Sequence, residues 1–451
     1  MSLFPKMGGK MLETTLALRL QEIDVIKRVG TIKKVAQGSL EACGPFAMVG
    51  EICEIDTTNI GKPLLAEIIA VKDDRIILVP FSQGALIRPN ARVIAKSVLG
   101  MAPVGDSFCG RAIDALGHAI DGGIDPVTPD HRPLTGNVLP PMSRSEPSVF
   151  VETGIRAIDG LLSIGKGQRI GVFAASGVGK TTLIQQLATQ IEADHCILCL
   201  VGERGREVEA IWSKLGTLPN KSKFTCVAAT SDVSAILRAR AVYQALALAE
   251  AWRDQGKHVV LIVDSVTRYA MAMREIGLAA GAPPTLRAYT PNVFAALPRL
   301  VERCGAAKNG GAITAILTVL SETDDVDDPI VEVMKSLLDG HIILSRQLAE
   351  QGHFPAIDVP KSVSRQSEDL IPSQLAQLAK QATQQLSVYE ASKILIDSGI
   401  YKAGANLGLD EAIKSRLNLL SFLQQSPKDH CRLGVTLERL QKTQSRGAAH
   451  V

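Results

Sequence analysis

The chain has 451 residues, of which 46% are hydrophobic, with a formal net charge of only +3. Its length corresponds to two or three domains at roughly 150 residues each, and its apolar content is ample for buried cores, which excludes a disordered chain. The small net charge and an aromatic content of 4% argue against a nucleic-acid partner, because such binding needs a basic footprint and stacking platforms.

The sequence of the N-terminal region predicts a short helix and shows no pattern of a signal peptide. From about Lys10 to Lys27, leucines and isoleucines recur at helical intervals with charges between them, which predicts a helix within an N-terminal segment of residues 1–29. Charges at Glu13, Arg19, Glu22 and Asp24 interrupt any apolar region of a signal peptide. Along the chain no apolar stretch approaches the ~20 residues that span a bilayer. We therefore expect a cytoplasmic protein.

Short strands are expected next, over residues 30–97. Apolar runs such as Leu65–Val71 and Arg75–Pro80 are split there by Gly, Pro and Asn. Closely spaced strands with turn residues predict a small β-barrel or a sandwich. Residues 122–147 then contain six prolines, and this density of fixed φ angles and missing donors predicts an extended connector.

The middle of the chain alternates between strand-like and helical patterns. The strand-like runs are Arg169–Ala174, Cys196–Val201, Phe224–Thr230, Val259–Asp264 and Ala312–Leu320. Such alternation predicts an α/β fold with a parallel sheet, here within a domain spanning residues 98–368. Three helical patterns follow in residues 369–451, which predict a C-terminal helical domain. They are Ser373–Ala391, Asp410–Gln425 and Val435–Gln441.

Eight cysteines are scattered along the chain without a paired framework. Cys196 and Cys199 form a C-x-x-C motif inside an apolar run. A zinc site needs a second ligand pair nearby, and none follows in the sequence. Two small core residues on a buried strand are therefore the favoured interpretation.

A glycine-rich turn between the first strand and helix of the α/β domain predicts a phosphate site. Residues 174–181 read Ala-Ala-Ser-Gly-Val-Gly-Lys-Thr, which fits the P-loop pattern except that Ala174 replaces its first glycine. The glycines let backbone N–H groups converge on phosphates at a helix N-terminus. Lys180 adds a cation for the β- and γ-phosphates, and the Thr181 hydroxyl can ligate Mg²⁺. The nucleotide-binding residues expected here are Ser176, Gly177, Val178, Gly179, Lys180, Thr181 and Thr182.

Two acidic residues follow other strands of the same sheet, at the end where ligands collect in parallel sheets. Asp264 ends a strand, and its carboxylate can hold the shell of Mg²⁺, although a helix N-cap or a solvated strand end is the alternative. Glu203 can polarise an attacking water. From the residues alone, a surface charge cluster of Glu203 with Arg204 or Arg206 explains it equally well.

The pattern as a whole predicts a Mg²⁺-dependent ATPase. Phosphoryl transfer also needs positive charge opposite the leaving phosphate. Arg365 follows a strand-like segment and is a candidate for that role beside Glu203 and Lys180. By its pattern alone, a surface arginine near a domain boundary is the better explanation of Arg365.

Six segments share the motifs of one known family. They are Thr153–Asp159, the P-loop, Gly202–Val208, Asp264–Ala270, Arg274–Gly281 and Leu338–Arg346. They resemble those of the type III secretion ATPases, which include the flagellar export ATPase and are relatives of the catalytic β subunit of rotary ATP synthases. The resemblance runs from about Gly30 to the C-terminal helical region.

The resemblance implies an N-terminal β-barrel, a RecA-like P-loop NTPase core and a helical C-terminal domain, assembled in rings of six with nucleotide between neighbours. It implies that Glu203 is the general base and Asp264 the magnesium aspartate. Arg365, in a Ser-x-Ser-Arg motif, would reach into the neighbour's site, and Arg204 would contact nucleotide. Phe354 matches an aromatic position, usually tyrosine, that packs on adenine; ordinary core packing is an equal alternative.

The implied function is a ring ATPase that energises type III protein export, flagellar or related, by releasing chaperones from substrates and unfolding them. The implied partners are further copies of the chain in a homohexamer, a stalk-like regulator, a central stalk-type protein, chaperones, export substrates and a membrane export gate. The gate would hold the protein peripherally at the inner face of the cell membrane. A rotary ATP synthase catalytic subunit and an RNA-dependent hexameric motor are the alternatives. The Gly-Arg-Glu-Val sequence of residues 205–208 resembles the secretion branch more closely.

Two segments depart from the family pattern. Residues 288–291, Ala-Tyr-Thr-Pro, stand where Gly-Tyr-Pro-Pro is more common, in a loop that faces the ring pore. Residues 321–325 lack the glycine usually found before the paired aspartates, in a loop near the subunit boundary. Neither departure touches the hydrolytic groups.

Overall fold

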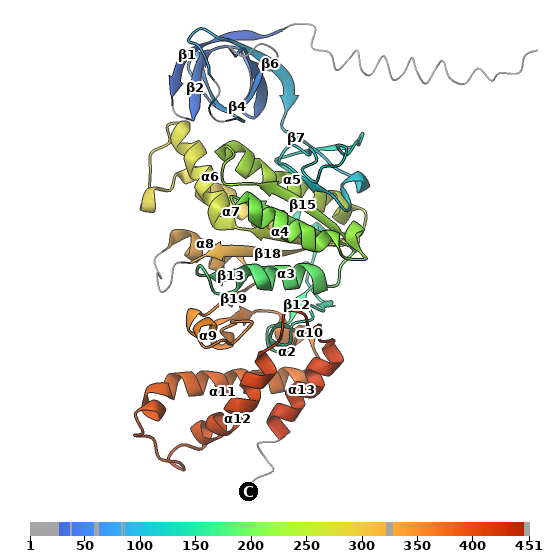
Figure 1. The fold of residues 1–451 in the computed structure, drawn as a ribbon, viewed down its shortest axis with the longest axis vertical. Coiled ribbons are helices and arrows are strands. Elements are labelled where there is room, and N and C mark those ends of the chain that lie inside the picture. Colours follow the sequence, from blue (N-terminus) through green and yellow to red (C-terminus); the bar gives the residue numbers. More distant parts are fainter. Residues whose placement is uncertain are drawn as a thin grey trace, which may run out of the picture. The chain divides into compact units, whose positions relative to one another are not determined.

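The computed structural model describes residues 27–36, 38–57, 63–82, 84, 86–321 and 328–445. The chain divides into two compact units, one of residues up to Met101 with Ala279–Gly281, and one of the remaining residues from Ala102 onward (Figure 1). Most of the helix predicted in residues 1–29, and most of the departing loop 321–325, lie outside the described residues. Of the helices that are described, none has the length and apolar character of a membrane span.

The first unit is built around a closed barrel of six antiparallel strands, hydrogen-bonded in the order β1-β2-β5-β4-β3-β6. The strands are β1 (Val29–Ala36), β2 (Ser39–Cys43), β3 (Glu51–Ile55), β4 (Leu64–Lys72), β5 (Arg75–Pro80) and β6 (Arg92–Leu99). Alternate residues, such as Cys53 and Ile55 on β3, are buried in one apolar cluster. Closure leaves no unpaired strand edge, so the barrel is the outcome of the two folds that the sequence allowed.

The second unit contains a ten-stranded sheet whose main path runs β20-β19-β13-β18-β16-β14-β15-β8. The bounds are β8 (Ala112–Ile113), β13 (Arg169–Ala174), β14 (His195–Val201), β15 (Phe224–Ala229), β16 (His258–Asp264), β18 (Ala312–Leu320), β19 (Gly340–Ile343) and β20 (Val363–Ser364). All neighbours from β19 to β8 are parallel, and β20 is antiparallel to β19. The five predicted strands are confirmed, each within one residue of its predicted bounds.

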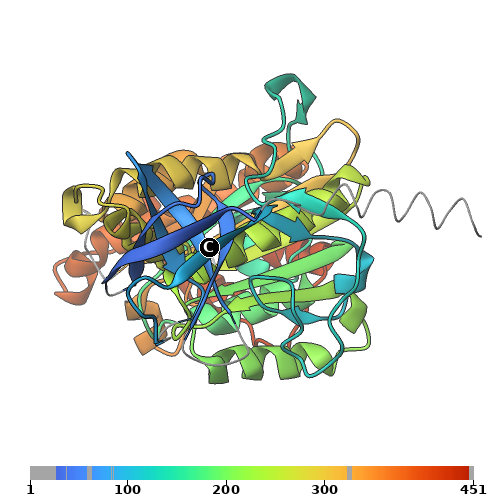
Figure 2. The same cartoon turned by 90° about the horizontal axis from the view of Figure 1, so that it is seen from above.

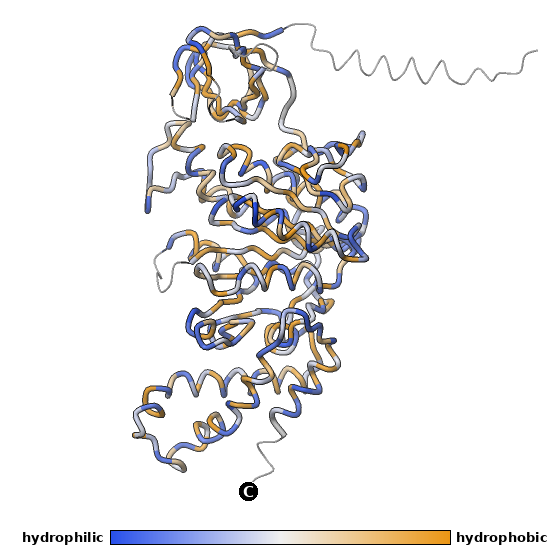
Figure 3. Tube along the Cα trace, in the orientation of Figure 1, coloured by the Kyte–Doolittle hydropathy of each residue, from blue (hydrophilic) through white to orange (hydrophobic). Residues whose placement is uncertain are grey.

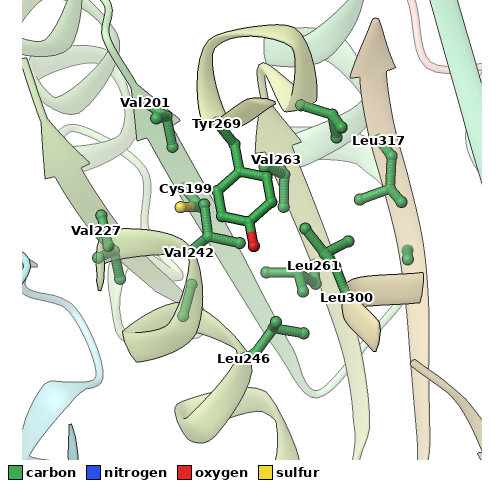
Figure 4. Close-up of a cluster of buried hydrophobic side chains, with 14 of the residues drawn as sticks. Cys199, Val201, Val227, Val242, Leu246, Leu261, Val263, Tyr269, Leu300 and Leu317 are labelled. Atoms are coloured by element: carbon green, nitrogen blue, oxygen red, sulfur yellow. The ribbon is translucent and has the colours of Figure 1, made fainter. Parts of the chain in front are cut away.

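Helices cover both faces of this sheet (Figure 1 and Figure 2). The larger ones are α3 (Lys180–Gln190), α4 (Gly205–Gly216), α5 (Ala235–Asp254), α6 (Val266–Ala279), α7 (Pro291–Glu302) and α8 (Pro329–Leu337). One core joins α5, α6, α7 and α8 to one face, and a close-up of it around Tyr269 is shown in Figure 4. A second core joins α3 and α4 to the other face. Figure 3 shows hydrophobic residues gathered along the strands between these layers.

The C-x-x-C cysteines lie in different cores. Successive residues of a strand point to opposite faces, so residues three apart do as well. Cys199 packs in the core with α5 and Cys196 in the core with α3. Both are buried and free, which confirms the prediction of two small core residues on a buried strand.

The segment predicted as an extended connector, residues 122–147, contains regular structure as well. It holds β9 (His131–Pro133), the 3₁₀ turn η2 (Pro141–Ser143) and β10 (Arg144–Ser145). β10 pairs with β17 (Gly305–Ala307) at the margin of the large sheet. β9, which ends in Pro133, belongs to a separate two-stranded sheet with β7 (Met101–Pro103). Each strand of such a sheet has a free edge, where the missing N–H of proline breaks no ladder, so a run of prolines does not exclude short strands.

The smaller elements around the parallel strands link the layers and the edges of the sheet. They are β7 (Met101–Pro103), η1 (Asp106–Phe108), β11 (Phe150–Val151), α2 (Arg156–Leu161), β12 (Ile164–Gly165), η3 (Lys221–Lys223), η4 (Leu286–Ala288), α9 (Arg346–Glu350), η5 (Val359–Lys361) and α10 (Ser367–Leu370). Of these, α2 matters most for the site described below, because its residues pack in the same core as α3.

Three helices end the described chain and confirm the predicted helical patterns. They are α11 (Ser373–Asp397), α12 (Leu407–Leu423) and α13 (Leu433–Ser445). α12 begins three residues before its predicted start because the Asn406 side chain accepts a hydrogen bond from the Leu409 N–H and caps the helix. It ends at Leu423, where the chain becomes extended.

The departure at residues 288–291 places an alanine in a conformation that favours glycine. Ala288 has a φ of 59°, in the left-handed region, where a Cβ is crowded by the backbone. Tyr289 is buried, and Pro291 occupies the first turn of α7, where its missing N–H has no helical partner to lose. The loop therefore keeps a turn that glycine would form without strain.

A buried ion pair joins α5 to the end of α7. Two nitrogens of the Arg303 guanidinium donate to the two carboxylate oxygens of Glu250 at 2.6 and 3.0 Å, and a third donates to the Leu134 carbonyl at 2.7 Å. The two side chains are 2% and 3% exposed. Each nitrogen of the guanidinium donates one hydrogen bond and each carboxylate oxygen accepts one, so the attraction between the two charges offsets the cost of burying them.

Removing one partner of this pair should destabilise the protein strongly. Glu250→Ala leaves a buried guanidinium without its counter-ion, and we expect a loss of about 3–5 kcal/mol in the free energy of unfolding, measured by urea denaturation. Glu332→Ala removes the exposed partner of Lys335 on α8 and serves as the control, with no measurable change expected. Equal effects of the two substitutions would contradict this account.

Candidate functional site

The glycine-rich turn joins β13 to the N-terminus of α3 through left-handed backbone. Gly177 and Gly179 have φ angles of 81° and 90°. A Cβ built on Gly177 meets nothing within 4 Å, so the space above the turn is open to a ligand. The first N–H groups of α3 have no helical partner and carry the positive end of the helix dipole. The turn therefore fits a phosphate chain by its backbone alone.

Three charged side chains meet beside this turn. Lys180 opens α3, Glu203 follows β14, and Asp264 ends β16. The Lys180 ammonium forms an ion pair with Asp264 Oδ1 and lies 3.9 Å from Glu203 Oε1. The side chains are only 11%, 12% and 4% exposed. Because the strands are parallel, their carboxyl ends lie at one edge of the sheet, and the predicted residues come together there.

Glu203 turns inward, away from the surface cluster that was its alternative. Its neighbours are Lys180 and Arg268, whose Nε lies 3.6 Å from Glu203 Oε1. Arg204 is exposed instead and lies 4.0 Å from Glu207. Burial, and then the nearby Asp264 carboxylate, raise the pKa of Glu203, whereas Lys180 and Arg268 lower it. A carboxylate with a raised pKa is a stronger base than an ordinary surface glutamate.

Arg268 was not singled out by sequence reasoning as a site residue. It lies on the first turn of α6, four residues after Asp264. A Cβ on Gly202 would lie 2.7 Å from Arg268 Cδ, so only glycine at that position lets the arginine cross to Glu203. Gly202, directly before Glu203, was the one signal in the sequence for this contact. Its role can be recognised only when the position of α6 is known.

Asp264 is oriented by the neighbouring strand. The Thr318 hydroxyl on β18 donates to Asp264 Oδ1 at 2.7 Å, and both residues are buried. This burial contradicts the alternative of a solvated strand end. Thr318 was missed because its contact with Asp264 depends on the register of β16 and β18, which no local pattern reports.

A hollow of about 240 Å³ lies beside the phosphate turn. It is lined by Phe354, by Thr182 of α3, and by Gln425 and Pro427 after α12. A Cβ on Gly179 would lie 3.3 Å from the Phe354 ring, so the ring borders the turn. Phe354 is 42% exposed, which favours a ring that offers one face to a ligand over ordinary core packing.

The structure does not bring Arg365 to this cluster. Arg365 follows β20, and the register Gly340↔Ser364 with β19 sets it beside the amino ends of the parallel strands. Its N–H donates to the Asp339 carbonyl, just before β19, at 3.1 Å. Lys180 and Glu203 lie at the carboxyl ends. An exposed Arg365 at the opposite end of the sheet cannot serve the site of its own chain.

The oxygen ligands fit Mg²⁺ bound together with phosphates. Within the part of the chain that the structure describes, no group of three or more His, Cys, Asp or Glu side chains could hold a metal ion. Mg²⁺ is usually held by one or two protein oxygens plus nucleotide phosphates and water, without such a cage. The Asp264 carboxylate and the Thr181 hydroxyl, next to Lys180, are donors of that kind.

Comparisons with known proteins show the family to which the chain belongs. A family model described as ATP synthase alpha/beta family, nucleotide-binding domain, matches residues 154–364, and one described as T3SS EscN ATPase C-terminal domain matches residues 371–442. The flagellum-specific ATP synthase of Bacillus subtilis is 43% identical over 413 residues, which cover 90% of this chain and 93% of that protein. The type 3 secretion system ATPase of Xanthomonas euvesicatoria is 39% identical over 430 residues, covering 95% and 97%.

Among solved structures, the assembled ATPase EscN of the enteropathogenic E. coli type III secretion system matches with a TM-score of 0.86 and 40% identity. The match covers 92% of this chain and 99% of that chain. The chain belongs to the flagellar and type III secretion ATPases. It is therefore a nucleotide-binding ATPase related to ATP synthase subunits, and the α/β fold class with a RecA-like core, an N-terminal barrel and C-terminal helices is confirmed.

The raised pKa of Glu203 predicts how hydrolysis by this ATPase depends on pH. A base must be ionised, so activity should fall as the pH drops through the pKa of Glu203, above the value of about 4.3 for an unperturbed glutamate. Arg268→Ala removes a cation that lowers this pKa, so the acid limb of the kcat profile should move to higher pH. Lys214→Ala, which removes an exposed cation of α4, is the control, and an unmoved limb in Arg268→Ala would refute the assignment.

Proposed function

We propose that this ATPase hydrolyses ATP at the cluster of Lys180, Glu203 and Asp264, in a ring of six copies, and thereby energises type III protein export. The meeting of these three side chains beside an open phosphate turn carries the proposal. A cation, a base and an oxygen ligand are the groups that ATP hydrolysis requires, and all three are largely shielded from solvent.

In this mechanism the backbone N–H groups of residues 176–182 and the Lys180 ammonium hold the triphosphate. Mg²⁺, held by Thr181 and Asp264, would neutralise phosphate charge when bound. Glu203 orients a water molecule and accepts its proton while the water oxygen attacks the γ-phosphorus and the bond to the β-phosphate oxygen breaks. Arg268, beside Glu203, keeps the carboxylate ionised and in place.

The remaining nucleotide contacts are proposed at the edges of the site. Phe354 stacks on the adenine in the hollow beside Gly179, and its half-exposed ring supports that role. The exposed Arg204, at the N-terminus of α4, contacts the nucleotide from the rim.

Arg365 acts on the site of a neighbouring copy. Its place beside the amino ends of the strands supports this role, because there it faces away from its own phosphate turn. A homohexamer brings such an edge against the next subunit. EscN was solved as an assembled ATPase, and we propose that this chain assembles in the same way.

The cellular role follows from the family. We propose that the ring releases chaperones from export substrates and unfolds them, at the cytoplasmic face of the cell membrane beside an export gate. EscN is known in complex with its central stalk EscO, and an equivalent stalk protein and a stalk-like regulator are the partners proposed here. The four segments 1–29, 30–97, 98–368 and 369–451 are the proposed domain organisation.

The role of Glu203 is tested by Glu203→Gln. The amide keeps the shape of the side chain but cannot accept the proton of water, so we expect turnover to fall by at least about 10²-fold while ATP binding is retained. Phosphate release and equilibrium ATP binding are measured on the same preparation. Lys180→Ala is the contrasting variant, because it should weaken binding itself. Hydrolysis undiminished by Glu203→Gln would remove this residue from the mechanism.

The role of Arg365 is tested by mixing subunits. Arg365→Ala rings should lose activity by about 10³-fold or more, the contribution of an arginine finger. Mixed with Lys180→Ala subunits, they should regain part of it, because some interfaces then pair an intact phosphate turn with an intact Arg365. Turnover is measured across mixing ratios. In the comparison, Arg204→Ala subunits are mixed with Lys180→Ala subunits, and no rescue is expected because Arg204 serves the site of its own chain. A complete lack of rescue would count against action in trans.

A further inference from the structure

The turn after α12 is held by a glutamine that uses its whole side chain for backbone contacts. Gln425 is 5% exposed. Its Oε1 accepts a hydrogen bond from the Arg156 N–H at 2.9 Å. Its Nε2 donates to the carbonyls of Gly154 at 2.7 Å and of Asp429 at 2.8 Å. Both amide hydrogens and the amide oxygen are therefore engaged.

The backbone of the same residue reaches the hollow beside the phosphate turn. The Gln425 N–H donates to the Phe354 carbonyl at 2.9 Å, and Gln425 itself lines the hollow together with the Phe354 ring. One residue thus connects the loop before α2, the Phe354 segment and the turn after α12. Removing a buried amide with these contacts is costly in free energy, because its buried hydrogen-bond partners are left unsatisfied.

The anchor on the far side is itself rigid. The Asp159 carboxylate on α2 accepts hydrogen bonds from the N–H groups of Thr153 and Gly154 at 3.0 and 2.9 Å. At the end of α3, Gln190 Nε2 donates to the Asp429 carbonyl at 3.1 Å. Gln425 therefore ties Phe354 to backbone that is fixed to the core of the sheet and to the helix of the phosphate turn.

We infer that Gln425 is a positioning residue for the purine of the nucleotide: it holds the Phe354 segment beside the phosphate turn, so that the Phe354 ring forms one wall of the hollow in which the purine packs. The inference rests on the proposed adenine site at Phe354. The four hydrogen bonds of Gln425 go to residues 154, 156, 354 and 429, and none of them goes to the phosphate turn. Its loss should weaken the binding of the base and leave the triphosphate contacts of Lys180 intact.

The experiment replaces Gln425 by methionine, which keeps the length of the side chain and removes its three side-chain hydrogen bonds. The backbone hydrogen bond to the Phe354 carbonyl remains, but the turn that carries it loses its anchor to residues 154, 156 and 429. KM for ATP should rise about tenfold, within the range of one lost stacking contact, whereas kcat should change less than twofold. Inorganic tripolyphosphate, which has no base, should inhibit the unmodified protein and the Gln425→Met variant with the same constant. Gln424→Ala, which truncates the exposed neighbouring glutamine, is the matched control and should leave KM unchanged.

A double variant tests whether Gln425 acts through Phe354. In a Phe354→Ala background, Gln425→Met should change KM for ATP less than twofold, because the ring that it positions is gone. An equal rise in KM for ATP and in the tripolyphosphate constant, or a tenfold further rise in the double variant, would overturn the inference. If Gln425→Met is unfolded by circular dichroism, Gln425→Asn is measured against the same outcomes. Tripolyphosphate that fails to compete with ATP in the unmodified protein would instead refute the phosphate site itself.

Discussion

The parallel register of β13, β18, β16 and β14 is the constraint on which the site depends. The carboxyl ends of these strands lie at the same edge of the sheet, so Lys180 after β13, Glu203 after β14 and Asp264 at the end of β16 meet there although they are far apart in sequence. Their side chains are nearly buried, and burial would penalise any one of the charges alone. The Lys180 ammonium compensates both carboxylates, Arg268 adds a second cation beside Glu203, and the Thr318 hydroxyl donates to Asp264.

In the proposed mechanism, Glu203 must accept a proton from water, and the neighbouring cations must not lower its pKa so far that it becomes a weak base. Burial and Asp264 raise the pKa of Glu203, and Lys180 and Arg268 lower it. The net effect is a raised pKa, which makes Glu203 a better base than a surface glutamate, and the two cations limit that rise. The glycine before Glu203 is part of the same balance, because a side chain there would displace Arg268.

The proposed adenine pocket and the phosphate turn are formed by different parts of the chain. The phosphate turn belongs to the sheet and α3, whereas the hollow beside it is completed by the turn after α12. Gln425 joins the two through the Phe354 carbonyl and the loop before α2. The turn after α12 is thereby a structural part of the proposed nucleotide site, and its position bears directly on the hollow.

The sequence by itself determined the strands, the helices and the identity of the phosphate turn. Local hydrophobic periodicity specified β13 and β18 to the residue, and glycines before Lys180 specified the turn, because both signals lie within a few neighbouring positions. Family motifs pointed to Glu203, Asp264 and Arg365. Only the tertiary structure decided that Glu203 faces Lys180 and Arg268, that Thr318 orients Asp264, and that Arg365 lies beside the opposite ends of the strands. It also decided between barrel and sandwich and brought Gln425 to Phe354. These outcomes depend on strand register and on contacts between residues distant in the chain, which local patterns of residues do not encode.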